Sequence, residues 1–476
     1  MLLVVSTHMT IWSRLSNAYG GRYIAFLASI CGGLKGTTAT LLASTMLPLF
    51  RNVLHLSNSD YQACLTIIML PWAMKSIFGL AVDRMRCITP SAMFVAAALV
   101  GTVSAALLAT QTLALYATTA LAFGISCHVA IADVLTEGSY ARQMRRVPGG
   151  AADLLTVVWW FLSIGSLVGT ILSGVLAEHN LTRAAFWIAC ALCAQSIMSG
   201  SFPRPVPLDN PTPGLFLLGV TVTVAACGLG LVSLSSVPAL RLAYPLVSTG
   251  LLLALAFAKL PKELAMCNAY MCVSNVLYIS LAGPLDFWYT ADQTCVPGGP
   301  SFSMSYYITF AGAVAAVSTI IGVAAFNKWI AHWQFQDMFR FTAMLRCCAA
   351  VADIIIINRW NLAIGIPDEI MFVCGNAVVA PIIAAMDTIP MVALTAKLCP
   401  PNEESTVYAL LASFQNFGGA AASALGLACA HHAGIMLKDT GHACSFDNLA
   451  PLVVVCNMLL PMLVYPLTYW LPAGGM

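Results

Sequence analysis

The chain has 476 residues, of which 60% are hydrophobic and only 8% are charged, and its net charge is +2. Soluble domains carry about 25% charged residues, so this composition excludes an ordinary soluble protein. It predicts an all-α polytopic membrane protein, because helices satisfy their backbone polar groups within lipid. The near-neutral charge and the lack of a long basic run in the sequence give no indication of nucleic-acid binding.

About fourteen apolar stretches approach the roughly 20 residues that cross a bilayer. In chain order we expect six spans near 22–49, 60–81, 90–110, 112–136, 153–177 and 184–203, and two near 213–236 and 239–258. Six more follow near 262–283, 303–326, 337–358, 366–396, 405–433 and 449–471. The stretch 366–396 contains Pro381 and Pro390, which favours one kinked helix over two crossings.

A proline-rich break at 202–213 divides this series of spans. We therefore expect a tail (1–21), a six-helix bundle (22–203), a linker with an inserted helix pair (204–261), a second six-helix bundle (262–471) and a short tail (472–476). Loops that carry most of the arginine and lysine residues face the cytoplasm in membrane proteins. Their distribution here predicts that both termini are cytoplasmic, with the lipid bilayer as the chain's surroundings.

Several charged residues fall inside the predicted spans, where an unpaired charge is costly and usually functional. The cations are Lys35, Lys75 and Arg346, and the acids are Asp133, Glu137, Asp353 and Asp387. All seven are candidates for binding or coupling. Trp159, Trp160, Phe287, Trp288 and Tyr289 could supply aromatic rings.

Each candidate also has a structural alternative. Asp133 could form an internal salt bridge with Lys35 or Lys75, and Lys75 could instead support a gate. Glu137 shares a helix face with Asp133 but lies nearer the cytoplasmic end, where it could be solvated. Arg346 and Asp353 are seven residues apart and could frame a polar stripe.

The 17 cysteines mostly scatter singly through apolar helices, which is typical of packing residues and predicts no metal site. Cys295 and Cys444 differ, because both fall in loops expected outside the cell, where disulfides persist. They are candidates for a disulfide, and two free thiols are the alternative. We expect no cofactor.

The string Gly79-x-x-x-Asp83-Arg84 resembles the gate loop after the second helix of major facilitator superfamily carriers. A wider set of motifs resembles the folate–biopterin transporter family, especially its protozoan branch: Leu70–Gly79, Ala132–Val134, Tyr289–Pro300, Gly365–Asp368 and Leu398–Gly418. The resemblance implies a six-plus-six helix bundle with two additional central helices. Ser76 departs from the family by replacing the proline after the buried lysine, which we expect to remove a kink from the second span.

The resemblance implies a secondary active transporter that imports pteridines, folate or biopterin, together with protons. We expect it in the plasma membrane, although the apolar helices alone do not indicate which membrane. A pterin ring presents an edge to which a carboxylate can bond twice, and folate adds a tail that needs cations. A carrier of another solute, such as S-adenosylmethionine, and a non-transporting membrane receptor remain alternatives. The sequence has no His-Glu-x-x-His or Gly-x-Ser-x-Gly motif, so we do not expect an enzyme. It gives no indication of oligomeric state.

Overall fold

The computed structural model describes residues 12–50, 54, 58–84, 89–110, 114–147, 151–179, 181–199, 214–235, 237–303, 305–399, 403–435 and 444–475. Helices lie at all of the predicted span positions. Within the described ranges, 11 helices are long and apolar enough to cross a membrane, and Thr182–Met198 is a shorter apolar helix. The total of about fourteen full crossings stays a prediction.

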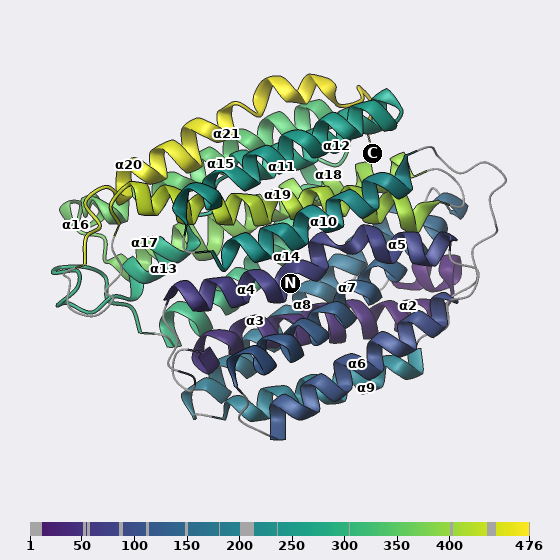
Figure 1. Ribbon diagram of the computed structural model, residues 1–476, viewed down its shortest axis with the longest axis horizontal. Helices are drawn as coiled ribbons and strands as arrows, with labels where there is room; N and C mark the ends of the chain where they lie inside the picture. Colours follow the sequence, from purple (N-terminus) through teal and green to yellow (C-terminus); the bar gives the residue numbers. More distant parts are fainter. Residues whose placement is uncertain are drawn as a thin grey trace.

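The first six positions are occupied by helices that run back and forth along the long axis of the molecule (Figure 1). They are α2 (Gly21–Leu27), which continues through the π-helical η1 (Ala28–Thr38) into α3 (Ala39–Pro48), then α4 (Asn58–Ala73) with α5 (Lys75–Arg84), α6 (Pro90–Thr110), α7 (Leu115–Arg146), α8 (Ala151–Glu178) and α9 (Thr182–Ser199). The next two positions hold α10 (Leu215–Ser233) and α11 (Pro238–Lys259).

The last six positions hold helices that are more often interrupted. They are α12 (Lys262–Leu277) with α13 (Ala282–Thr290), η4 (Ser305–Phe310) with α14 (Ala311–Trp329), α15 (Phe335–Ile357), α17 (Asp368–Phe372) with η5 (Val373–Val379) and α18 (Ala380–Leu398), α19 (Glu404–His432), and α20 (Leu449–Val453) with η6 (Val454–Leu459), α21 (Leu460–Met462) and η7 (Tyr465–Trp470). The short α16 (Trp360–Ala363) follows α15.

Three of these spans test sequence predictions in detail. The stretch from Asp368 to Leu398 is a single long helix, as its prolines suggested. The span expected at 262–283 is interrupted between α12 and α13 and extends to Thr290. The loss of a kink expected from Ser76 is wrong, because α4 ends at Ala73 and α5 begins only at Lys75.

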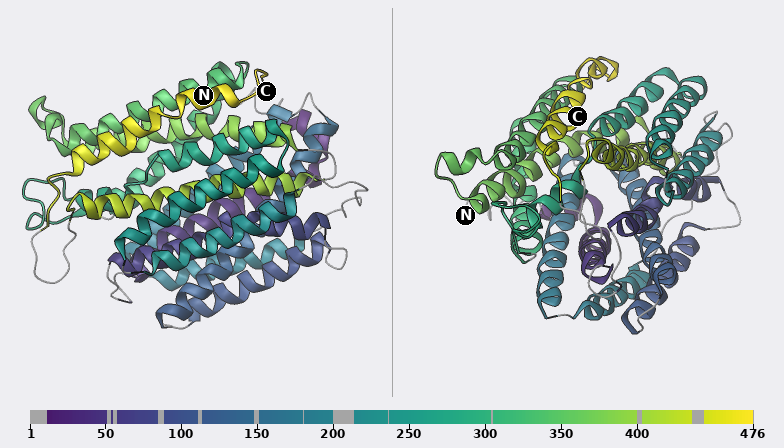
Figure 2. Two further views of the ribbon diagram at one scale, coloured as in Figure 1. Left: turned by 45° about the horizontal axis from the view of Figure 1, so that its top comes forward. Right: turned by 60° about the vertical axis from the view of Figure 1, so that its left-hand side comes forward.

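Helices α2 to α9 form one group and α12 to α21 another, seen as the lower purple-to-blue and upper green-to-yellow parts of Figure 1. The two groups meet where α19 packs against α4, α5 and α7, and where α8 packs against α14. Helix α10 packs against α4, α5 and α19, while α11 packs against α12 and α19 (Figure 2). The additional pair therefore lies along the junction between the two groups, which we call the N half and the C half.

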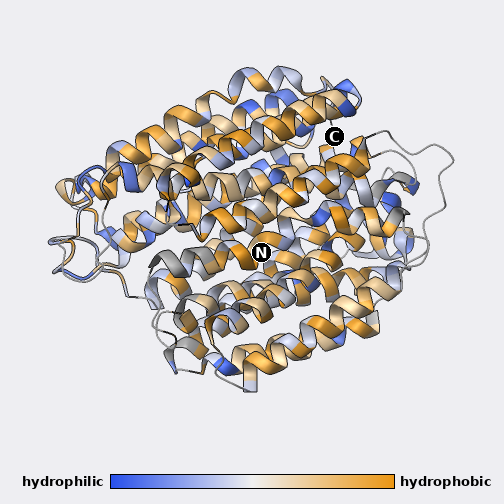
Figure 3. Cartoon of the chain, viewed as in Figure 1, coloured by the Kyte–Doolittle hydropathy of each residue, from blue (hydrophilic) through white to orange (hydrophobic). Residues whose placement is uncertain are grey.

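Most residues along the helices are hydrophobic, and many of the hydrophilic residues lie near the two ends of the bundle (Figure 3). Large side chains such as Leu99, Val103, Ile164 and Ile171 are about half exposed on α6 and α8. Exposed apolar surface of this extent would be unfavourable in water but is the normal surface of a helix in lipid. We name the ends by residues: the Arg84 end, where α5 and α7 finish and α19 begins, and the Cys295 end, where α13 finishes and α17 begins.

Candidate functional site

Four of the predicted membrane charges come together in one cluster inside the N half. Asp133 accepts from Lys35 at 2.6 Å through one carboxylate oxygen and from Lys75 at 2.5 Å through the other. Glu137 accepts from Lys75 at 3.1 Å and lies 3.7 Å from Lys35. Two ammonium groups and two carboxylates thus balance each other, and we call these four residues the charge quartet.

Three helices supply the quartet. Asp133 and Glu137 lie one turn apart on α7, so their carboxylates face the same side. Lys35 projects from the π-helical η1, and Lys75 is the first residue of α5. Lys75, Asp133 and Glu137 are almost fully buried, whereas the Lys35 side chain is 22% exposed.

Helix η1 lies unusually close to α8 beside this cluster. An added side-chain carbon on Gly165 would overlap the Gly32 carbonyl, so glycine is required at this crossing. Close backbone approach of this kind is typical of helix contacts in membranes. It fixes the helix that presents Lys35.

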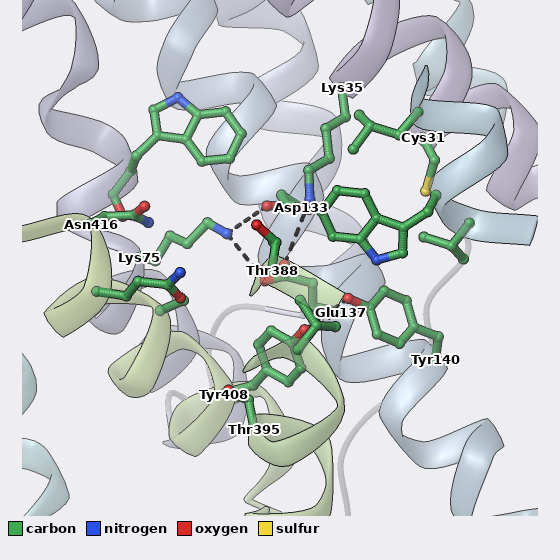
Figure 4. Close-up of a pocket in the computed structure, with 17 residues that line it drawn as sticks. Cys31, Lys35, Lys75, Asp133, Glu137, Tyr140, Thr388, Thr395, Tyr408 and Asn416 are labelled. Atoms are coloured by element: carbon green, nitrogen blue, oxygen red, sulfur yellow. Dashed lines mark hydrogen bonds and ion pairs between the residues drawn. The ribbon is translucent and has the colours of Figure 1, made fainter. Parts of the chain in front are cut away.

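A cavity of about 150 Å³ lies beside the quartet, between the N half and the C half. Figure 4 shows the side chains of Lys35, Lys75, Asp133 and Glu137 pointing toward one another, with residues of α18 and α19 beside them. The lining includes Cys31, Trp72, Tyr140 and Trp159 from the N half and Thr388, Thr395, Tyr408, Gln415 and Asn416 from the C half. The Lys75 ammonium also lies 5.0 Å from the centre of the Trp72 ring.

The two halves are in close contact between this cavity and the Arg84 end. The hydroxyl groups of Tyr140 and Tyr408 are 2.9 Å apart, and both side chains are buried. Thr406 donates to the Gly79 carbonyl at 3.1 Å, and a side-chain carbon on Gly79 would lie only 2.5 Å from the Ser405 carbonyl oxygen. Gly79 therefore permits α5 and α19 to touch.

The other two residues of the predicted gate, Asp83 and Arg84, end α5 at this same end of the bundle. Their side chains lie outside the described part of the structure. Whether Gly79, Asp83 and Arg84 act as a gate stays a prediction.

Arg346 and Asp387 form a separate ion pair within the C half, at 3.1 Å between α15 and α18. Thr342 also donates to Asp387 at 2.6 Å, and the Arg346 guanidinium lies 4.1 Å from the centre of the Tyr278 ring. Tyr278 stands at the interruption between α12 and α13. Asp387 directly precedes Thr388, which lines the cavity, but neither Asp387 nor Arg346 is among the lining residues.

Asp353 has partners other than Arg346. It accepts from Tyr289 at 2.6 Å and from Asn376 at 2.8 Å, nearer the Cys295 end. Tyr289 stacks on Phe302 with 5.8 Å between ring centres. Asp353 and the Trp288–Tyr289 rings thus belong to an aromatic cluster of the C half and are not among the residues that line the cavity.

A disulfide joins Cys295 and Cys444, with 5.2 Å between their Cα atoms. It links the segment after α13 to the segment before α20. Within the described ranges, no group of three or more histidine, cysteine or acidic residues could hold a metal ion.

Sequence reasoning missed several cavity residues. Tyr140 could have been found because it lies one turn after Glu137 and two turns after Asp133 on α7. Tyr408 and Asn416 lie within the motif Leu398–Gly418, but their polarity alone gave no signal of a cavity. Trp72 lies three residues before Lys75 and could have been included among the candidate aromatic residues.

Comparison with known proteins decides the family. The model of the BT1 family matches residues 35–475. The chain belongs to the BT1 family. Among its relatives, the probable folate-biopterin transporter 6 of Arabidopsis thaliana is 26% identical over 422 residues, covering 86% of this chain and 77% of the relative. The folate-biopterin transporter of Synechocystis sp. is 30% identical over 163 residues, covering 34% of this chain and 31% of the relative.

Solved structures support the fold of this BT1 family member. The POT family transporter PepTSo superposes with a TM-score of 0.68 over 94% of this chain and 98% of that chain, at 11% identity. An auto-inhibited POT family peptide transporter gives a TM-score of 0.64 at 14% identity, over 94% of this chain and 95% of that chain. The predicted all-α fold of the major-facilitator type is confirmed, and with the family it makes the chain a multi-pass membrane transporter of a small molecule and not an enzyme.

Proposed function

We propose that this BT1 family member imports pteridines, folate or biopterin, together with protons and by alternating access. The observation that carries the proposal is the charge quartet beside a cavity shared by the two halves. Its relatives in Arabidopsis thaliana and Synechocystis sp. are named as folate-biopterin transporters, some of them as probable ones.

The chemistry of the cavity suits a planar ring with a hydrogen-bonding edge. Asp133 or Glu137 could accept two parallel hydrogen bonds from the amino-pyrimidine edge of a pterin. Trp72 and Trp159 line the same cavity and offer ring faces for stacking. Arg346 is the nearby cation of the C half, and by leaving Asp387 it could receive a carboxylate of a folate tail.

The charge balance of the quartet favours joint binding of a proton and an anion. With all four groups ionised the quartet is neutral, so a proton on either carboxylate leaves one ammonium unpaired. An uncompensated charge within the membrane is costly, and a substrate anion or carbonyl would compensate it. The same reasoning disfavours a cationic solute such as S-adenosylmethionine, which would add to the excess positive charge.

The proposed setting is the plasma membrane, with both termini, and thus the Arg84 end, in the cytoplasm. The arginine and lysine residues of the loops support this orientation. In that orientation the contacts of Tyr140 with Tyr408 and of Gly79 with Ser405 lie between the cavity and the cytoplasm.

Uptake in a heterologous host that lacks its own pteridine carriers tests the solute. Cells expressing the protein would be given labelled folic acid, biopterin or S-adenosylmethionine, with cells expressing Lys75→Ala at equal surface abundance as the matched control. We expect accumulation of folic acid or biopterin that depends on Lys75. Accumulation of S-adenosylmethionine alone would support the alternative carrier, and binding of a pteridine without any uptake would support a receptor.

A further inference from the structure

The second span is interrupted immediately before Lys75, and residues of the C half occupy the interruption. In a continuous α-helix the Ser76 amide would donate to the Trp72 carbonyl. Instead the Ser76 amide donates to the hydroxyl of Ser413 at 2.7 Å, and the Trp72 carbonyl accepts from the side-chain amide of Asn416 at 2.9 Å. One helical hydrogen bond is thus replaced by two bonds to α19.

The neighbouring backbone confirms that the helix is open at this point. The Met74 amide completes the last turn of α4 by donating to the Leu70 carbonyl at 3.0 Å. The Ile77 amide turns to the Met74 carbonyl at 3.1 Å, which is a tighter turn than an α-helix makes. Lys75 lies between these two points, so the direction of its side chain depends on the opening.

The same opening determines where the Lys75 ammonium can reach. Its two carboxylate partners both lie on α7, at 2.5 Å from Asp133 and 3.1 Å from Glu137. Bonds this short tolerate little displacement of the ammonium. Closing the helix would change the twist and rise between Trp72 and Ser76, and would therefore move Lys75 relative to α7.

We propose that Ser413 and Asn416 are positioning residues for Lys75, holding the second span open while the two halves are in contact. When α19 moves away, the Trp72 carbonyl and the Ser76 amide lose their partners within the membrane. A buried polar group left without a partner is unfavourable within the membrane, so these two groups bond to each other and the helix closes. Movement of the C half thereby changes the pairing of Lys75 with Asp133 and Glu137.

This inference rests on the proposed function in one respect, namely that the charge quartet handles the transported solute. A positioning role for Ser413 has different consequences from a role in packing alone. If Ser413 merely filled a buried polar position, its loss would act through stability, and no change at Ser76 would repair it. If Ser413 holds the helix open, a substitution at Ser76 that prevents the helix from closing should compensate for the loss of Ser413.

Ser76→Pro is the substitution that should prevent closure. Proline has no amide hydrogen to return to Trp72, and its ring keeps the carbonyl four residues earlier at a distance. In the Ser413→Ala protein, uptake of labelled folic acid or biopterin should fall about tenfold or more, as expected for the loss of one buried hydrogen bond of roughly 1.5 kcal/mol. Ser413→Ala combined with Ser76→Pro should recover at least several-fold of that loss.

Two further variants complete the series. Asn416→Ala removes the second bond and should lower uptake in the same direction, which keeps the proposal testable if the proline variant fails to fold. Ser423→Ala, on the same helix but outside the cavity lining, is the matched control and should retain normal uptake. All variants are compared at equal surface abundance and with a single symmetric peak in size-exclusion chromatography.

A cryo-EM structure of the purified Ser413→Ala protein supplies a readout that does not depend on the solute. We expect a helix that is continuous through Met74, with the Lys75 ammonium displaced from Asp133. An interruption that persists at Met74, normal uptake by Ser413→Ala, or a proline variant that worsens the defect would overturn the proposal. If the unaltered protein takes up neither folic acid nor biopterin, the proposed function fails, and the Ser413→Ala structure still decides the positioning role.

Discussion

Asp133 is the carboxylate of the charge quartet that hydrogen-bonds to both lysines. Each of its carboxylate oxygens accepts from a different ammonium group, at 2.6 and 2.5 Å. Glu137 accepts one hydrogen bond, at 3.1 Å from Lys75, and its distance to Lys35 is 3.7 Å. Loss of the Asp133 charge therefore affects two ion pairs directly, whereas loss of the Glu137 charge affects one short pair and one longer one.

Asp133→Asn should abolish concentrative uptake, and Glu137→Gln should reduce it less. Both changes preserve size and leave the quartet with one excess positive charge. Removing one partner of a buried ion pair costs about 3–5 kcal/mol. Asp133→Asn leaves only Glu137, which lies 3.7 Å from Lys35, whereas Glu137→Gln leaves Asp133, which contacts both lysines closely. Initial rates and accumulation ratios, measured at equal surface abundance, check the ranking. A larger defect in Glu137→Gln would reject it.

Residue type and depth were sufficient to predict which charges lie within the spans, and the sequence also suggested the pairing of Asp133 with Lys35 or Lys75, but not the remaining contacts. A lysine or an acid in an apolar span is conspicuous in the sequence, and the quartet consists entirely of such residues. The division between the quartet, the Arg346–Asp387 pair and the Asp353 cluster depends on which helices are neighbours. A single sequence does not show which helices pack against each other.

At the level of helices, the spans could be predicted because their lengths and hydropathy are set by the bilayer. The interruptions could not. The break before Lys75 is held by Ser413 and Asn416, more than 300 residues later in the chain, so no local pattern around Ser76 could reveal it. The π-helical segment that carries Lys35 packs against α8, which is also distant in the sequence.

The contact between α5 and α19 leads to a second prediction. Gly79→Ala places a carbon 2.5 Å from the Ser405 carbonyl oxygen, so α5 and α19 must separate at the Arg84 end. We expect uptake to fall several-fold and the melting temperature of the purified protein to decrease. Gly419→Ala is the matched control on α19, because its added carbon meets nothing within 4 Å. Equal effects of the two changes would argue against a requirement for close approach.

The additional pair α10–α11 should not determine which solute is carried. No residue of this pair lines the described cavity, although α10 packs against α4 and α5 and accepts a hydrogen bond from the Ser76 hydroxyl at 3.0 Å. Replacing the pair with an unrelated apolar hairpin should therefore lower stability while preserving the order of preference among competing pterins. Competition assays on folded protein measure that order. A changed preference would assign the pair to the site.

The linked loops at the Cys295 end lead to a fourth prediction. The bond between Cys295 and Cys444 joins residues that are 149 positions apart in the sequence, and a disulfide typically stabilises a protein by about 2–4 kcal/mol. Mass spectrometry of unreduced, alkylated protein should recover the two cysteines in one linked peptide. Cys295→Ser with Cys444→Ser should lower the melting temperature without altering solute preference. Two separately alkylated peptides would show that the thiols are free in the cell.

For the molecule as a whole, the close packing of the two halves has a direct bearing on transport. The cavity lies between them, and their contacts near the Arg84 end involve α5, α7 and α19. In the alternating-access mechanism that we propose, these contacts separate while others form. A solute then crosses without a continuous pore, and the gradient of a second species supplies the energy for accumulation.

Protons are that species in our proposal, and the prediction follows from the charge balance of the quartet. A neutral cluster of two acids and two bases takes up one proton to become cationic, and it then retains an anionic solute better than the unprotonated cluster does. Lower external pH increases the inward proton gradient and the fraction of outward-facing carriers that hold a proton, so uptake should increase as external pH falls.

An ionophore that collapses the proton gradient should abolish accumulation but leave exchange of labelled for unlabelled solute, because exchange needs no net proton movement. Asp133→Asn is the control, since it should be insensitive to both treatments. Undiminished accumulation after the gradient is removed would exclude proton coupling and direct attention to another ion.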